Sequence, residues 1–204
     1  MAQTISYDDF VRMLRCAAAQ IRANHEHLSQ LDSVGGDGDH GTTMVRAMGC
    51  LEKAVDADTS AQVPALLQNV GWAIMGVDGG ATGPLLGTLF SSMSDAANQV
   101  LDAAGIAAAF EAGLAGVQRQ TKAQLGDKTM IDALVPAVGA LRKAADDGLA
   151  VGPALQCAAE AAAAGAASTV TLQARFGRAR NIKEQSIGTQ DPGATSISLI
   201  FKGF

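Results

Sequence analysis

The chain has 204 residues, of which 48% are hydrophobic and only 4% aromatic, and its formal net charge is −5. This acidic balance argues against a general nucleic-acid or anionic-membrane surface, because both favour a strong basic excess. The apolar residues are mostly Ala, Leu, Val and Met, which favour helix over sheet. We therefore expect an all-α protein, and the length predicts a single domain over residues 1–204.

The cysteines and the first residues of the chain indicate the cellular compartment of the protein. Cys16, Cys50 and Cys157 lack paired or metal-type spacing, and each lies in an apolar helical pattern. Reduced core cysteines are typical of a cytosolic protein. The start of the chain has neither the basic region nor the apolar region of a secretion signal. No apolar run approaches the roughly 18 residues of a membrane span. These features predict a cytoplasmic protein with no membrane or nucleic-acid partner.

Apolar residues recur at helical spacing in eight segments. The first predicted helix begins at Ser6, with Asp9 three residues later as a capping pair, and continues to about Leu28. The other predicted helices cover approximately residues 42–55, 62–75, 84–100, 106–120, 129–147, 153–174 and 193 to the terminus. Residues 169–172 and 196–201 contain many β-branched residues or alternate like a strand, but we predict both as helical.

Three carboxylates, those of Asp32, Asp37 and Asp39, lie on a glycine-rich turn that leads into the second predicted helix. Two such charges about 4 Å apart repel by roughly 4 kcal/mol at an effective dielectric near 20, so a cation must offset the repulsion. Mg²⁺ prefers carboxylate oxygens and fills its other positions with water and substrate phosphate. An EF-hand is excluded, since its twelfth position would be Thr43 or Met48 instead of glutamate. The turn therefore predicts a magnesium site for a phosphate ligand.

Glycine-rich turns precede predicted helices at three places, and helix N-termini offer free N–H groups to phosphate. The turns are residues 40–43, 79–83 and 126–130. Taken singly, each is more typical of a helix cap than of a ligand site, and neither of the first two has P-loop or Rossmann spacing. The long connection over residues 175–193 carries Arg175, Arg178, Arg180 and Lys183, which face either phosphate or water.

Four motifs together resemble the nucleotide-binding L subunit of dihydroxyacetone kinases. They are Asp-x₄-Asp-Gly-Asp-His-Gly-x-x-Met from Asp32, Gly-Gly-Ala-Thr-Gly-Pro-Leu from Gly79, Gly-Asp-Lys-Thr-Met from Gly126, and Ser-Ile-Gly-x-Gln-Asp-Pro-Gly-Ala-Thr-Ser from Ser186. They occur in the order and spacing of that family over nearly the whole chain.

The resemblance implies an eight-helix antiparallel barrel that holds ADP or ATP at one end through two Mg²⁺ ions. It assigns the metal to Asp32, Asp37 and Asp39. It places around the nucleotide the residues His40, Gly41, Thr42, Thr43, Ala81, Thr82, Met130, Arg178, Asp191, Pro192 and Gly193. Thr121 stands where the family has a glycine, which puts its contact in question. Phosphoryl transfer depends mainly on positioning and charge neutralisation, so we assign no general base to this chain.

The resemblance also implies partners. In this family a separate K subunit holds dihydroxyacetone covalently through a histidine, and the L subunit presents the phosphoryl group to it. The phosphoryl donor is either a phosphohistidine protein of the phosphotransferase system, which recharges bound ADP, or exchangeable ATP. The sequence does not decide between these donors, and it leaves a homodimer open.

Three alternatives remain at this point. The amino-terminal domain of fatty acid kinases has a related turn, but with threonine at the position of His40. Another small ketose, such as a tetrulose, could be the acceptor because the absent partner selects it. A nonenzymatic role as a nucleotide-binding regulatory partner is the third alternative.

Overall fold

The computed structural model describes residues 4–98 and 101–204, and over these residues it is built from α-helices and short 3₁₀ segments. The α-helices are α1 (Tyr7–Ala23), α2 (His25–Ser33), α3 (His40–Ala57), α4 (Val63–Met75), α5 (Thr82–Met93), α6 (Ala103–Gln120), α7 (Ile131–Asp146), α8 (Val151–Ser168) and α9 (Pro192–Gly203). The 3₁₀ segments are η1 (Thr169–Thr171) and η2 (Arg178–Ser186). The predicted all-α class is confirmed.

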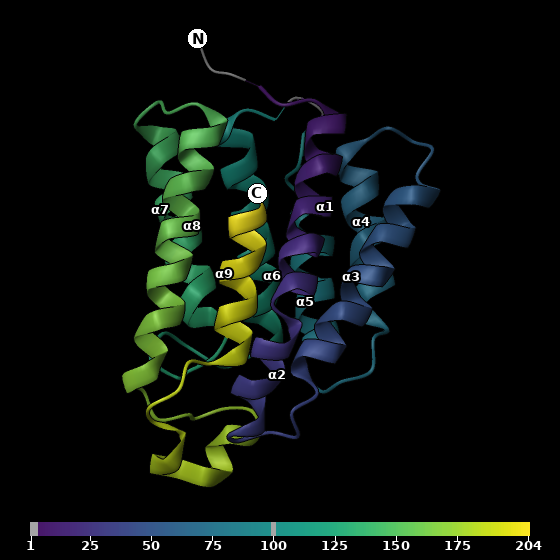
Figure 1. Ribbon diagram of the computed structural model, residues 1–204. Helices are drawn as coiled ribbons and strands as arrows, with labels where there is room; N and C mark the ends of the chain where they lie inside the picture. Colours follow the sequence, from purple (N-terminus) through teal and green to yellow (C-terminus); the bar gives the residue numbers. More distant parts are fainter. Residues whose placement is uncertain (1–3, 99–100) are drawn as a thin grey trace.

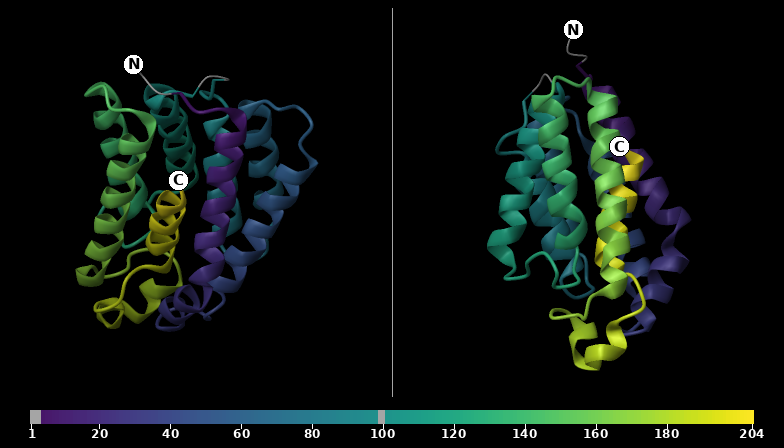
Figure 2. Two further views of the ribbon diagram at one scale, coloured as in Figure 1. Left: turned by 45° about the horizontal axis from the view of Figure 1, so that its top comes forward. Right: turned by 90° about the vertical axis from the view of Figure 1, so that its left-hand side faces the viewer.

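Eight of these helices form a closed ring. Helix α1 packs on α3, each helix from α3 to α8 packs on the next, and α9 packs back on α1. Neighbours around the ring run in opposite directions (Figures 1 and 2). The short helix α2 is additional and packs against α3 and α9 at one end. The ring therefore agrees with the predicted eight-helix antiparallel barrel.

The first predicted helix is in fact two helices. Asn24 separates α1 from α2 with a non-helical backbone (φ −116°, ψ 12°), and its side-chain amide donates to the carbonyl of Gln20 at 2.7 Å. This bond satisfies a carbonyl at the end of α1. Helix α2 then continues to Ser33, so Asp32 lies in the last turn of a helix and not in the glycine-rich turn itself.

Two further boundaries differ from the prediction by more than three residues. Helix α5 ends at Met93, where the Ser94 hydroxyl donates to the carbonyl of Ser91 at 2.6 Å; residues 99 and 100 of the predicted helix lie outside the described residues. Helix α8 ends at Ser168 instead of Ala174, because Thr169–Thr171 tightens into 3₁₀ geometry. The segment 196–201, which alternates like a strand, is helical, as predicted.

Local chemistry explains how the helices start and how closely they approach. Ser6 and Asp9 form a reciprocal capping box at the start of α1, with the Asp9 N–H donating to the Ser6 hydroxyl at 3.1 Å. Helices α4 and α5 meet at small residues: a Cβ on Gly71 would lie 2.5 Å from the backbone nitrogen of Ser91. The core is mostly aliphatic, and the rings of Phe110 on α6 and Phe201 on α9 pack together within it.

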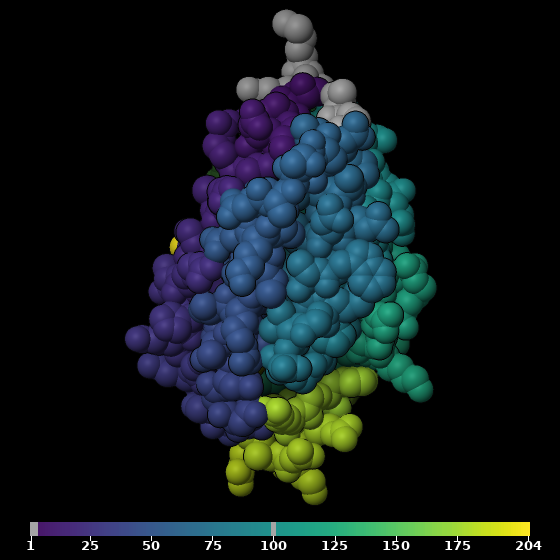
Figure 3. Space-filling model, turned by 90° about the vertical axis from the view of Figure 1, so that its right-hand side faces the viewer, coloured from purple at the N-terminus to yellow at the C-terminus, as the bar shows by residue number. Residues whose placement is uncertain are grey.

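The connections α2–α3, α4–α5, α6–α7 and α8–α9 all lie at the same end of the ring, the lower end in Figure 1. Figure 3 shows the yellow-green α8–α9 connection covering this end beneath α3, α4 and α5. Among the helices of the described part of the chain, none has both the length and the apolar character needed to cross a membrane. The up-and-down order thus gathers residues that are distant in sequence at one end.

Candidate functional site

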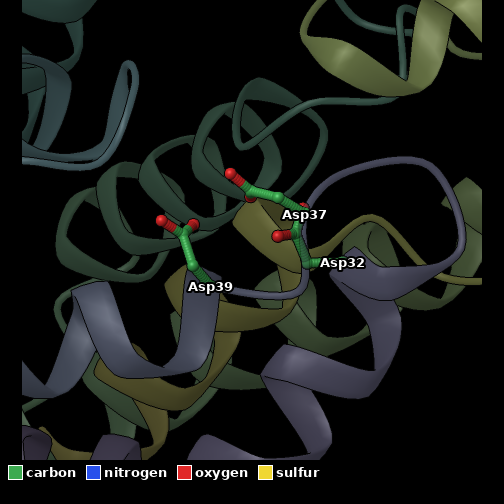
Figure 4. Close-up of side chains that lie close together, drawn as sticks. All are labelled: Asp32, Asp37 and Asp39. Atoms are coloured by element: carbon green, nitrogen blue, oxygen red, sulfur yellow. The ribbon is translucent and has the colours of Figure 1, made fainter.

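An acidic cluster lies at this end (Figure 4). Asp32 comes from the last turn of α2, Asp37 from the following turn, and Asp39 from the position before α3. One carboxylate oxygen of each lies within 4.8 Å of those of the other two. Gly36 allows this approach, since a Cβ there would lie 2.2 Å from Asp32 Oδ1. Three converging carboxylates fit the oxygen ligand set that Mg²⁺ prefers.

Charged and polar partners hold the cluster from two sides. Arg178 of η2 forms an ion pair with Asp37, and the backbone N–H of His40 donates to Asp32 Oδ2 at 3.3 Å. Partial desolvation acts to raise the pKa of Asp37, but hydrogen bonds and the positive charge of Arg178 together lower it below the usual value. The carboxylate of Asp37 is thus favoured in its ionised form, which is the form that binds metal.

His40 connects three helices beside the cluster. Its Nε2 lies 2.8 Å from the hydroxyl of Ser196 on α9, and its Nδ1 lies 3.4 Å from the hydroxyl of Thr82 on α5. Burial lowers the pKa of His40, against the opposing charges of Asp32 and Asp39. A ring held between two hydroxyls suits a role in which His40 orients neighbouring groups through hydrogen bonds.

Two adjoining cavities open next to the cluster. The first, which we call the apolar cavity, has a volume of about 280 Å³ and is walled largely by side chains such as Met44, Leu86 and Ile197. The second, the acidic cavity, has a volume of about 200 Å³ and is lined by Asp32 and Asp39. The two share His40, Ala81, Thr82, Phe176, Gly177 and Asp191.

The structure brings most of the predicted site residues to these walls. Those on the apolar cavity are His40, Ala81, Thr82, Thr121, Met130, Asp191 and Gly193. Those on the acidic cavity include Asp32, Asp39, Arg178 and Pro192. Thr121, whose contact the resemblance left in question, ends α6 and faces the same space as Met130.

Three predicted nucleotide contacts are not on the walls of either cavity. Gly41 is buried against α2, and a Cβ there would lie 1.9 Å from the carbonyl oxygen of His25. Thr43 is buried and accepts a hydrogen bond from Arg46 at 2.9 Å. Thr42 is exposed in the first turn of α3. Their roles toward a nucleotide remain predictions.

Sequence reasoning did not nominate Lys128 or Phe176, which also line the apolar cavity. Lys128 has only 4% of its surface exposed, and burial lowers the pKa of its ammonium. It belongs to the Gly126–Met130 motif, which was the available signal. For Phe176 the sequence offered none, since a single aromatic residue in a polar connection is not distinctive.

Asp191 connects the site to the start of α9. Its carboxylate accepts the backbone N–H of Ala194 at 2.7 Å, which caps the helix, and its own N–H donates to the hydroxyl of Thr169 at 2.8 Å. Burial raises the pKa of Asp191 to about 7 despite the capping bond. The turn of Asp191, Pro192 and Gly193 is therefore fixed at the walls of the two cavities, with Asp191 lining both.

Comparison with known proteins shows which family has a similar sequence. The chain is 40% identical over 179 residues to the "PEP-dependent dihydroxyacetone kinase, ADP-binding subunit DhaL" of Escherichia coli (strain K12), covering 87% of this chain and 85% of that one. It is also 40% identical over 186 residues to an "L-erythrulose 1-kinase" of Mycolicibacterium smegmatis, covering 88% of this chain but only 32% of that one.

Solved structures show similarity to the same group of kinases. The dihydroxyacetone kinase of C. freundii in its native form matches all of this chain with a TM-score of 0.75 and 27% identity, while this chain covers 35% of it. The same enzyme "in complex with AMP-PNP and Mg2+" matches with a TM-score of 0.75 and 26% identity, and 34% of it is covered. The family model described as the DAK2 domain matches residues 34–204. The chain belongs to the DAK2 domain family.

Proposed function

We propose that this protein is the ADP-binding subunit of a dihydroxyacetone kinase, which presents a phosphoryl group to the ketose held by a separate K subunit. The observation that carries the proposal is the convergence of Asp32, Asp37 and Asp39 beside two adjoining cavities. The E. coli relative named an ADP-binding subunit matches over most of both chains, and the C. freundii structure was determined with a nucleotide analogue and Mg²⁺; both support it.

The proposed roles follow from the chemistry of each wall. The three aspartates would hold Mg²⁺, for which we propose two ions, and the metal would supply charge neutralisation to the phosphate oxygens. Arg178 adds a guanidinium at the acidic cavity, where the polyphosphate belongs. The apolar cavity, with Thr121 and Met130 on its wall, suits the adenine ring.

The phosphoryl donor and the acceptor are parts of the same proposal. Relatives named as PEP- or PTS-dependent subunits favour a phosphohistidine protein that recharges bound ADP over exchangeable ATP. The likeness to an L-erythrulose 1-kinase favours a tetrulose as the second candidate acceptor. We place dihydroxyacetone first, because the subunits named for it match over most of their own length.

Mg²⁺-dependent ADP binding tests the proposal. The Asp39→Asn variant keeps the shape of a side chain that faces the acidic cavity but removes its charge, and it should weaken ADP binding in Mg²⁺ by about 100-fold or more. Calorimetric titration of ADP, with Mg²⁺ and with a chelator, measures the change. The matched control is Asp95→Asn, an exposed residue after α5, which should bind ADP like the wild type.

Wild-type protein that binds no ADP in the presence of Mg²⁺ would refute the proposal. Equal binding by wild type and Asp39→Asn would refute the metal assignment alone. With ADP bound, exchange of labelled ATP into the native protein separates the donors: slow exchange supports the phosphohistidine donor, and rapid exchange supports ATP.

A further inference from the structure

The connection between α8 and α9, residues 169–191, brings part of the site into place. We call it the crossover. It carries Phe176, Gly177 and Arg178 to the two cavities and ends at Asp191. Its regular structure is limited to 3₁₀ segments, and η2 is kinked at Lys183, where φ is 50°. A segment of this kind has little internal rigidity, so its position depends on what anchors it.

Lys128, in the α6–α7 turn, contacts both ends of the crossover. Its ammonium donates to the carbonyl of Thr169 at 2.7 Å and to the carbonyl of Thr189. Thr169 is the residue at which the chain leaves α8, and Thr189 lies two residues before Asp191. With 4% of its surface exposed, Lys128 has its charge removed from solvent, so these carbonyls replace water as its partners.

The neighbouring residue reinforces the same anchor. The backbone carbonyl of Asp127 accepts the N–H of Arg175 at 3.1 Å, and its side chain pairs with the Arg175 guanidinium at 3.3 Å. The turn is itself fixed, because the buried carboxylate of Asp132 accepts the N–H groups of Gly126 at 2.6 Å and Thr129 at 2.7 Å. A rigid turn thus holds the crossover before and after η2.

We propose that Lys128 is a positioning residue of the nucleotide site: it holds the two ends of the crossover together and so fixes Arg178 and Asp191 at the cavities. This inference rests on the proposed function for its nucleotide part. Hydrogen bonds to a charged group are stronger than those between neutral groups. Because both acceptors are backbone carbonyls, these two bonds are removed by changing Lys128 and not by changing the side chains of Thr169 or Thr189. Without the ammonium, the two ends lose their shared anchor.

The Lys128→Met variant tests the inference in the full chain, because methionine keeps most of the side-chain length and has no donor. Two readouts are needed: hydrogen exchange of crossover amides in ligand-free protein, and the rate of ADP release in Mg²⁺. We expect faster exchange at residues 186–191 with unchanged exchange in α4, and ADP release about 10- to 100-fold faster. In Lys128→Arg, amide exchange in the crossover and the rate of ADP release should both be close to those of the wild type, since a guanidinium can also donate to two carbonyls.

Lys122→Met is the matched control, because Lys122 is an exposed lysine of the same connection. It should leave both readouts unchanged. If Lys128→Met does not fold, Lys128→Gln replaces it, because the shorter neutral amide keeps a polar group in the buried site but removes the ammonium that joins the two carbonyls, and a smaller change in the same direction is expected.

Wild-type exchange and ADP release in a folded Lys128→Met protein, or in Lys128→Gln where that variant replaces it, would overturn the inference. Wild-type protein without ADP binding would refute the proposed function instead. The exchange readout would then still decide whether Lys128 anchors the crossover.

Discussion

At the end of the barrel opposite the site, the first residue of α1 contacts the α3–α4 connection. The Tyr7 hydroxyl donates to Asp58 Oδ2 at 2.6 Å. Burial, followed by the hydrogen bond to Asp58 and its negative charge, raises the pKa of Tyr7 to about 12. Tyr7 is the only tyrosine of the chain, so its ionisation can be followed without ambiguity.

Titration of tyrosinate absorbance should therefore give a midpoint near 12 in the wild type. Because the folded pKa lies above the unfolded value of about 10, the stability that Tyr7 contributes is present below pH 10 and is lost as the pH rises through 12. Asp58→Asn should move the midpoint toward 10 by removing the charge. Asp56→Asn, which alters an ion pair with Arg15, is the control, and a wild-type midpoint near 10 would contradict the prediction.

The site residues differ in how far the sequence reveals them. Asp32, Asp37 and Asp39 lie within eight positions of each other, so their convergence follows from one local turn. Lys128 acts on carbonyls 41 and 61 residues away, and a partner of that kind is not visible in local spacing. The sequence also could not separate Gly41, which packs between helices, from residues that line the cavities.

Whole helices were more predictable than their ends. Apolar periodicity predicts α4 and α6 within a few residues, because burial on one face sets both the pattern and the helix. The break at Asn24 was missed, since apolar spacing continues through it to Leu28. The 3₁₀ segments of the crossover were missed as well, because their positions depend on contacts with other elements.

The contact between α2 and α3 depends on the absence of a side chain at Gly41. A Cβ there would lie 1.9 Å from the carbonyl oxygen of His25 and 2.7 Å from the hydroxyl of Ser29. Gly41→Ala must therefore push α2 away, and it should lower the free energy of unfolding by about 1–3 kcal/mol. Urea unfolding measures the change.

Gly139→Ala is the matched control for this contact. Gly139 lies inside α7, and a Cβ there would meet no atom of another described element within 4 Å, so alanine adds only helix propensity. This variant should gain about 0.5–1 kcal/mol. Equal stability of Gly41→Ala and the wild type would show that α2 can shift without cost, and the tight packing would then not constrain the acidic cluster.

The closed ring has a consequence for the molecule as a whole. Helix α9, last in the chain, packs between α8 and α1, so the barrel is complete only when the last helix is in place. Its Phe201 is 1% exposed and lies 4.8 Å from Phe110 of α6, measured between ring centroids. We therefore predict that the chain unfolds as one cooperative unit, as expected for a single domain over residues 1–204.

Phe201→Ala tests this cooperativity. Removing a fully buried ring should lower the free energy of unfolding by about 3–5 kcal/mol, a large part of the roughly 5–15 kcal/mol of a typical domain. Hydrogen exchange at increasing urea should show α4 and α9 becoming exposed together, with the same shift in both, although they lie in different parts of the ring. Trp72→Ala, which removes a side chain that is 64% exposed on α4, should change stability by less than about 0.5 kcal/mol. Exposure of α9 at a lower urea concentration than α4 would mean that the ring opens before the rest unfolds, and the chain would then consist of at least two units of separate stability.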